Sequence, residues 1–328
     1  MTFTRRRLFS AFPLLSRLSA AELSKIKLGV TTDEIDEDAL TAVKLLREFG
    51  LQYAEVRNVW GKYNTAQPVE KIQELRGIFD QHRIKTSILG TGFFKVPLPA
   101  SAAELDNQWS LLASAMERAK VLGTDKIRVF GFTYKDGETP ASSAYPRIYE
   151  LVTEAARRAK RRGFRLALEN VGSSYIWSSE QAAGILNAVR EDNFGLTWDA
   201  NNAGQTGEKP FPDGYRKLDV ARIIHVHLRD YRKNVAGKYE WCAVGEGEMD
   251  NLGQIRALLE AGYQETFTLE THYKHPQGKA AATRTSLGAL LKVIGKVYGL
   301  SHFFSPTVST QPPSDASARQ PVPVPDRS

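Results

Sequence analysis

Short runs of β-branched and aliphatic residues alternate with amphipathic stretches through the body of the chain, residues 25–300. Eight such runs predict strands, and their starts lie about 25 to 45 residues apart, the spacing of a strand plus a crossover helix. The predicted strands are Lys27–Thr31, Tyr53–Arg57, Lys85–Leu89, Lys126–Phe130, Arg165–Glu169, Gly195–Asp199, Ile223–Leu228 and Thr266–Glu270.

Between these strands, apolar residues recur every three or four positions, which predicts helices with one buried face. The predicted helices are Asp38–Phe49, Val69–His82, Ala103–Leu122, Tyr145–Arg162, Glu180–Arg190, Leu252–Ala261 and Arg284–Tyr298. Residues 207–221 have a weaker pattern that allows only a short helix. Gly50, Gly123 and Gly163 stand where glycine ends a helix, and Ser179 and Asp250 stand where a side chain caps a helix N-terminus.

Eight strand–helix units without a second zone of different composition predict a single α/β domain, a closed (β/α)₈ TIM barrel over residues 25–300. An open doubly wound sheet is the weaker alternative, because no Gly-x-Gly-x-x-Gly turn follows any predicted strand. A Walker phosphate loop is also absent. The 328 residues, 42% of them hydrophobic, are enough for a barrel of about 250 residues.

The two ends differ from this body. Residues 1–24 contain Thr4–Ser10, which resembles a twin-arginine export signal, followed by a short apolar patch that Arg17 interrupts. Export to the periplasm and a basic leader on a cytoplasmic protein are therefore both open. Residues 301–328 are rich in proline, serine and threonine, which predicts a disordered tail.

The formal net charge of +7 does not indicate a nucleic-acid-binding protein. Residues 1–24 contribute +3 of it, and the basic run at residues 157–162 falls late in a predicted helix, where it complements the helix dipole. The single cysteine, Cys242, excludes an intramolecular disulfide and cysteine-based zinc sites. No stretch approaches the roughly 20 apolar residues of a membrane span.

Active sites of such barrels lie at the carboxyl ends of the strands. The first four predicted strands end in polar or small residues that offer few metal ligands, whereas each of the last four ends in a carboxylate or an imidazole. These four residues are Glu169, Asp199, His227 and Glu270. A buried carboxylate in an apolar strand is costly unless it is paired or binds a metal.

Each of the four has another explanation when taken alone. Glu169 could form a strand-end salt bridge, Asp199 could cap the next helix, and either His225 or His227 could be only a packed histidine, because alternate strand residues share a face. Their convergence on one barrel mouth favours a metal site. Three carboxylates and one imidazole suit Mn²⁺ or Mg²⁺, with Co²⁺ or Zn²⁺ as alternatives.

The segments Leu166–Asn170, Gly195–Asp199, His225–Asp230 and Gly245–Asp250 together resemble the sugar phosphate isomerase/epimerase family, in the xylose-isomerase-like TIM barrel superfamily. The resemblance spans roughly residues 25–297. It implies a metal site of Glu169, Asp199, His227 and Glu270. The ligand histidine is then His227 rather than His225, because it precedes Leu-Arg-Asp.

The resemblance also implies that Glu169 and Glu270 form the acid/base pair of an epimerase. The chain departs from the family pattern at substrate-facing positions, with Asn202 where histidine is common and Lys233 where arginine is common. Val171 and Tyr175 replace a histidine and a glutamate. The candidate substrate-binding residues are Asn202, Arg229, Lys233, Glu246 and Trp60.

The leading hypothesis is a metal-dependent isomerase or epimerase that acts on a small carbohydrate by enediolate-type proton transfer. A dehydratase acting on a cyclic polyol or keto-sugar is an alternative, and a non-catalytic sugar-binding barrel is another. An endonuclease IV-like phosphodiesterase is disfavoured, because that chemistry needs several more histidines than the strand ends supply. A homo-oligomer is compatible with the sequence, and no nucleic-acid partner is expected.

Overall fold

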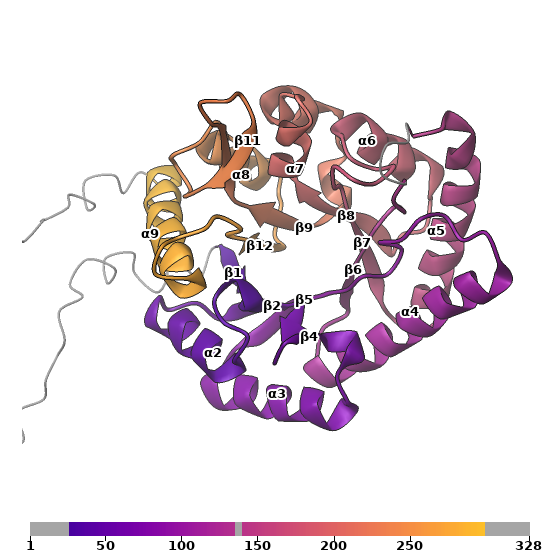
Figure 1. Cartoon of the computed structure of the whole chain (residues 1–328), viewed down its shortest axis with the longest axis horizontal. Coiled ribbons are helices and arrows are strands. Elements are labelled where there is room, and N and C mark those ends of the chain that lie inside the picture. The colour runs from indigo at the N-terminus through magenta and orange to yellow at the C-terminus, as the bar shows by residue number, and fades with distance from the viewer. Residues whose placement is uncertain (1–25, 135–139, 299–328) are drawn as a thin grey trace, which may run out of the picture.

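The computed structural model describes residues 26–134 and 140–298, so the predictions for residues 1–24 and 301–328 lie outside the described residues. Eight parallel strands close into a barrel in the order β1-β12-β9-β8-β7-β6-β5-β2, with helices around them (Figure 1). The predicted (β/α)₈ barrel is thereby confirmed. Its strands are β1 (Lys27–Thr31), β2 (Tyr53–Val56), β5 (Lys85–Gly90), β6 (Lys126–Val129), β7 (Arg165–Glu169), β8 (Phe194–Asp199), β9 (Ile223–Leu228) and β12 (Thr266–Leu269).

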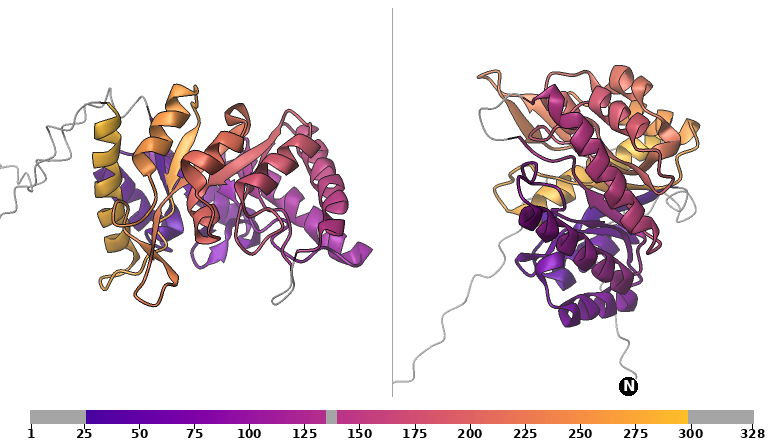
Figure 2. Two further views of the ribbon diagram at one scale, coloured as in Figure 1. Left: turned by 90° about the horizontal axis from the view of Figure 1, so that it is seen from above. Right: turned by 90° about the vertical axis from the view of Figure 1, so that its right-hand side faces the viewer.

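The outer ring of helices encloses the strands from every side (Figure 2). It consists of α2 (Ala39–Glu48), α3 (Val69–His82), α4 (Ala102–Leu122), α5 (Tyr145–Lys160), α6 (Ser179–Ala188), α8 (Asn251–Glu260) and α9 (Lys279–Val297). Short α7 (Ala200–Gln205) follows β8, and irregular single turns occupy most of residues 207–222. Two small hairpins, β3 (Asn58–Val59) with β4 (Lys62–Tyr63) and β10 (Asp230–Lys233) with β11 (Tyr239–Cys242), follow β2 and β9. No described helix combines the length and the apolar character that crossing a bilayer requires.

The predicted helix ends are largely confirmed. Gly50, Gly123 and Gly163 all adopt positive φ, between 72° and 78°, the conformation in which glycine ends a helix without a Cβ penalty. Asp250 caps α8 by accepting a hydrogen bond from the Gly253 N–H at 2.8 Å. The prediction for Ser179 was wrong by one residue. The cap of α6 is the preceding serine, whose hydroxyl faces the first turn, whereas the Ser179 side chain bonds Glu208.

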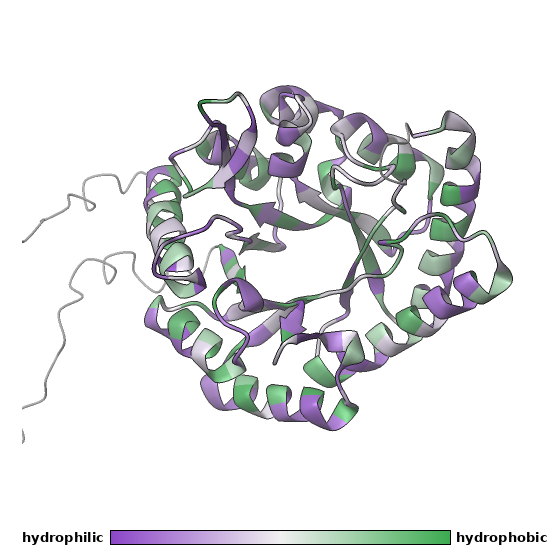
Figure 3. Ribbon diagram, in the orientation of Figure 1, coloured by the Kyte–Doolittle hydropathy of each residue, from purple (hydrophilic) through white to green (hydrophobic). Residues whose placement is uncertain are grey.

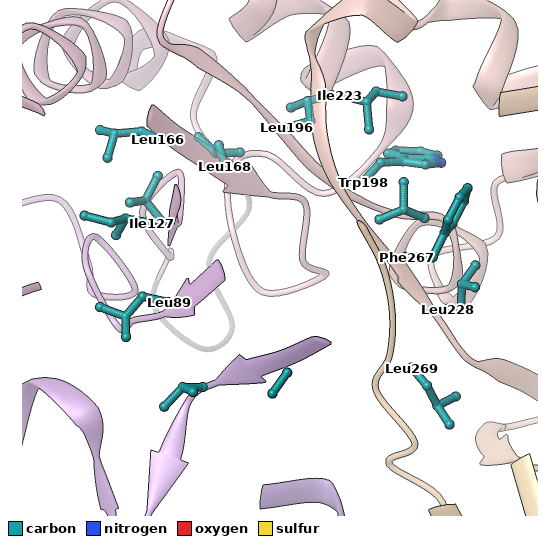
Figure 4. Close-up of a cluster of buried hydrophobic side chains, with 14 of the residues drawn as sticks. Leu89, Ile127, Leu166, Leu168, Leu196, Trp198, Ile223, Leu228, Phe267 and Leu269 are labelled. Atoms are coloured by element: carbon teal, nitrogen blue, oxygen red, sulfur yellow. The ribbon is translucent and has the colours of Figure 1, made fainter. Parts of the chain in front are cut away.

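The main hydrophobic core lies between the strands and the helices. Side chains such as Leu166, Leu168, Leu196 and Trp198 point outward from neighbouring strands and form part of a continuous buried band (Figure 4). The helices meet this band with their own apolar residues and carry hydrophilic residues elsewhere (Figure 3). Burial of this band is the main stabilising term of the fold, at roughly 25 cal/mol per Å² of apolar surface.

The interior of the barrel is polar by contrast. Ala167 alternates with outward-facing leucines on β7, so it faces inward. It joins only Ile88 and Ile224 in a small separate apolar cluster. Buried charged and threonine side chains line much of the rest, among them Glu55 and Arg128, both at most 2% exposed. Because charges buried this deeply must be paired, the interior forms connected ion-pair networks at both ends of the barrel.

Candidate metal centre

The four predicted ligands meet at the carboxyl ends of neighbouring strands. Glu169 ends β7, Asp199 ends β8, His227 lies on β9 and Glu270 directly follows β12. One donor atom from each lies within 4.8 Å of the others. The Nδ1 atom of His227 is 3.4 Å from Glu169 Oε1, 3.7 Å from Asp199 Oδ2 and 3.4 Å from Glu270 Oε2. All four residues are buried, at 3% exposure or less.

These residues fit a divalent cation. Among the described residues, Nδ1 of His227 has no hydrogen-bond partner although it is fully buried, and it faces three carboxylates. A buried, unbonded nitrogen needs an explanation, and a metal ion is one that also uses the carboxylates. Burial lowers the pKa of His227, but Glu55, Glu270 and Glu169 outweigh this and hold that pKa well above its usual value. The carboxylates around His227 therefore favour a positive charge at this position.

Three arginines, Arg128, Arg229 and Arg57, contact the two glutamates. Glu169 turns Oε1 toward His227 and Oε2 toward Arg128 Nη1 at 3.1 Å. Glu270 turns Oε2 toward His227 and toward Arg229 Nη1 at 3.0 Å, while its Oε1 accepts from Arg57 Nη1 at 2.6 Å. Each carboxylate thus has one oxygen anchored by an arginine and one directed at the His227 nitrogen.

The arginines also keep Glu270 ionised. Burial raises its pKa, but Arg229, together with His272, His227 and Arg57, lowers that pKa well below the usual value. Arg57 belongs to a wider network, because its guanidinium also bonds Asp33 at 2.8 Å. A carboxylate that stays charged at neutral pH can bind a cation or accept a proton without first losing one.

The first half of the barrel also brings charged residues to the region of the four predicted ligands. Glu55 on β2 and Arg128 on β6 lie within 3.3 Å of each other, and Arg57 reaches Glu270 from the segment after β2. A charged residue inside an apolar strand was the signal that identified Glu169. Glu55 and Arg128 also stand as charged residues in apolar strands, but the sequence prediction did not include them among the site residues.

Two of the five candidate substrate-binding residues lie at the cluster. Asn202 donates to Glu169 Oε1 at 3.3 Å and accepts from Arg229 Nη2 at 2.9 Å. Arg229 also contacts Asp199 and Glu270. Both side chains are buried against the predicted ligands, so both can influence how a ligand is oriented there.

The other three candidates lie away from the cluster. The ammonium group of Lys233 lies over the Tyr239 ring, on the β10–β11 hairpin. The side chain of Glu246 is 58% exposed and lies 3.8 Å from Arg232. Trp60, in the β3–β4 hairpin, stacks under Lys71 of α3. No contact between these three residues and the four predicted ligands is seen in the described part of the chain.

A hollow of about 610 Å³ lies beside the cluster, between the β10–β11 hairpin and the loop after β12. Trp241 and His272 form the side of this hollow nearest the cluster. The guanidinium carbon of Arg229 is 4.1 Å from the centre of the Trp241 ring, and His272 Nε2 is 4.0 Å from Glu270 Oε1. The volume is in the range of small-molecule sites.

The chain is similar to known proteins in sequence and in fold. A family model described as xylose isomerase-like TIM barrel matches residues 43–293. An inosose isomerase of Bacillus velezensis is 25% identical over 238 residues, which is 70% of this chain and 81% of that protein.

Two solved structures have the same fold. The IOLI protein with a bound zinc atom matches with a TM-score of 0.68 and 21% identity, over 83% of this chain and 99% of that chain. A xylose isomerase-like TIM barrel protein from Mycobacterium smegmatis, in complex with magnesium, matches with a TM-score of 0.61 and 19% identity, over 83% and 97%.

Proposed function

Because this chain belongs to the xylose isomerase-like TIM barrel family, we propose that it is a divalent-metal-dependent isomerase or epimerase of a sugar or sugar derivative. The observation that supports this most is the buried set of three carboxylates around the unbonded Nδ1 of His227. The similarity to an inosose isomerase supports a polyhydroxylated carbonyl compound as the substrate class.

Glu169, Asp199, His227 and Glu270 would hold the ion. When bound, a divalent ion acts as a Lewis acid that polarises a carbonyl and so acidifies the adjacent C–H group. Mn²⁺ and Mg²⁺ suit the oxygen-rich ligand set, and Zn²⁺ or Co²⁺ remain compatible with the histidine.

Glu169 and Glu270 are the proposed acid/base pair. They come from β7 and from the end of β12, which β8 and β9 separate in the barrel, so they approach a substrate at the mouth from different sides. One glutamate would remove a proton from carbon and the other would return a proton. The arginine contacts to both carboxylates hold them in place for this transfer.

The substrate would lie over the cluster and extend toward the hollow beside Trp241. Asn202 and Arg229 are the proposed contacts to its oxygen atoms at the metal, because both already lie against the ligand carboxylates. Glu246 lines the same hollow and is a proposed contact there, whereas Lys233 and Trp60 are weaker proposals, since they lie away from the cluster.

Solvent isotope exchange tests this function. The Mn²⁺-loaded protein is incubated in D₂O with a panel of ketoses, aldoses and inososes, and the products are followed by NMR. We expect a rearranged product that carries deuterium at the carbon that receives the returned proton, which is the carbon that lost its proton in an epimerase and the former carbonyl carbon in an isomerase. Glu270→Ala should reduce turnover by at least about 100-fold, the usual size of a general acid/base effect. Glu74→Ala, on the exposed face of α3, should have no effect.

The other outcomes identify the alternatives. Release of water with formation of an unsaturated or cyclised product would indicate a dehydratase. Binding without any exchange of carbon-bound hydrogen, with Glu270→Ala weakening only that binding, would indicate a sugar-binding protein. Either result would contradict the isomerase or epimerase proposal.

A further inference from the structure

Glu55 is a fully buried carboxylate next to the cluster but outside the predicted ligand set. It lies on β2, across the barrel from β9, and its side chain is 0% exposed. Its Oε2 atom is 2.8 Å from His227 Nε2 and 3.2 Å from His225 Nε2. Its Oε1 atom is 3.3 Å from Arg128 Nη1. A charge buried this deeply is costly to maintain, so its contacts call for an explanation.

We propose that Glu55 is the positioning residue of the metal centre, which holds His227 with Nδ1 directed at the ion. A neutral imidazole carries one N–H, and an ionised carboxylate can only accept a hydrogen bond. When the imidazole is neutral, the 2.8 Å contact therefore keeps its proton on Nε2 and its lone pair on Nδ1, the nitrogen that faces Glu169, Asp199 and Glu270. This inference rests on the proposed metal site.

The surroundings of Glu55 fix it in that position. The pairing of β2 with β5 shifts register between Ala54 and Glu55, so that Glu55 pairs with Ile88. On β5, a Cβ at Gly90 would lie 3.1 Å from Glu55 Oε1 and 3.3 Å from Arg128 Nη2. Glycine at this position leaves the room that the Glu55–Arg128 pair occupies. The carboxylate is thus held by packing and by charge before any ion binds.

A second metal ion is the competing explanation, because Glu55, His225 and His227 also lie close enough together to share one. The geometry favours the hydrogen bonds. Both histidines already share the single Oε2 atom at hydrogen-bonding distance, so a second ion between these three residues would have to displace both contacts. The two explanations predict different stoichiometries, one ion per chain or two.

Calorimetric titration of the metal-free protein with Mn²⁺ tests the proposal. We expect the wild-type chain to bind one ion and Glu55→Gln to bind that ion about 10- to 100-fold more weakly, as is typical when an outer partner of a metal-binding histidine is lost. Glu265→Gln is the matched control, because Glu265 is a partly buried carboxylate in an ion-pair network that does not include any of the four ligands. The Mn²⁺ affinity of the Glu265→Gln variant should equal that of the wild type.

Spectroscopy of the Co²⁺-loaded proteins gives a second readout. The visible absorption of Co²⁺ depends on its ligands, so it should change in Glu55→Gln and stay unchanged in Glu265→Gln. If Glu55→Gln does not fold, ¹⁵N-histidine NMR of the Zn²⁺-loaded wild type replaces it, and the proton of His227 should be found on Nε2. A proton on Nδ1 would overturn the proposal.

Three titration results would also overturn it. Equal Mn²⁺ affinity in the wild type and Glu55→Gln would show that Glu55 does not position His227, while the proposed metal site itself would stand. Two ions in the wild type and one in Glu55→Gln would show that Glu55 is a ligand. A wild-type chain that binds no ion would overturn the proposed metal site and this inference together.

Discussion

Asp199 shows how one carboxylate serves two purposes in this barrel. Its Oδ1 atom accepts the backbone N–H groups of Asn201 and Asn202, both at 2.9 Å, and so caps α7. Its Oδ2 atom faces His227 and Arg229. From sequence, a helix cap and a metal ligand were competing explanations for Asp199. The structure shows that they are compatible, because each uses a different oxygen.

The raised pKa of His227 predicts competition between protons and metal ions. In the metal-free protein His227 keeps its charge above the usual pKa of 6.5, and an ion can bind Nδ1 only after the proton leaves. We therefore expect the apparent Mn²⁺ affinity to fall about tenfold for each unit by which the pH drops below the pKa of His227. Calorimetry across neutral pH measures this. A pH-independent affinity would show that His227 is not a ligand.

The same shift has a consequence for stability. Because the folded-state pKa of His227 lies above its unfolded value, the stabilisation it gives the metal-free protein is complete below about pH 6.5 and is lost as the pH rises through the folded-state pKa. Metal binding should therefore raise the melting temperature more at high pH than at low pH. Melting temperatures measured with and without Mn²⁺ at several pH values test this expectation. A larger increase in melting temperature at low pH than at high pH would contradict it.

At the scale of elements, hydrophobic periodicity was enough to place every barrel strand and the main helices to within a few residues. It was enough because each strand buries an outward apolar face against a helix, as Leu166 and Leu168 do on β7. It also identified the strand ends at which the four proposed ligands lie. The contacts across the barrel were not predictable, because Glu55 meets His227 only after β2 and β9 have been brought to opposite sides of a closed barrel whose pairings contain register shifts.

One glycine on β8 is required by such close packing. A Cβ at Gly195 would lie 2.2 Å from the backbone oxygen of Arg222, just before β9. We expect Gly195→Ala to lower the free energy of unfolding by about 3 kcal/mol, because backbone rather than a flexible side chain must move. Urea denaturation measures this.

Gly77→Ala is the control for that substitution. Gly77 lies within α3, and a Cβ there meets no heavy atom within 4 Å apart from the helix's own backbone and chain neighbours. Alanine should stabilise this helix by about 1 kcal/mol. If the two variants changed stability by the same amount and in the same direction, the packing argument for Gly195 would be wrong.

At the scale of the whole molecule, a second ion-pair network joins strands that are distant in sequence. Glu265, just before β12, accepts from Lys126 Nζ at 2.6 Å and from Arg165 Nη1 at 2.8 Å, at the start of β6 and of β7. Burial raises the pKa of Glu265, but these two hydrogen bonds outweigh it and lower the pKa from 4.5 to about 2. Burial lowers the pKa of Lys126, which disfavours its charged form. The stabilisation by this network therefore comes from the ionised carboxylate of Glu265.

This network should contribute to acid stability. Because the pKa of Glu265 is depressed in the folded state, its contribution is complete above about pH 4.5 and is lost as the pH falls toward 2. We expect Glu265→Gln to cost about 2 kcal/mol at neutral pH and progressively less below pH 4.5. Urea denaturation of both proteins across this range measures the difference, and a gap that widened in acid would contradict the expectation.

The central claim is that the carboxyl end of the barrel holds one divalent ion on Glu169, Asp199, His227 and Glu270. The direct measurement is the metal content of the Mn²⁺-loaded, desalted protein, determined by mass spectrometry for the wild type and for Asp199→Ala. The account predicts one ion per chain in the wild type and loss of that ion in the variant. No ion in the wild type, about three ions per chain, or equal retention by the variant would contradict it.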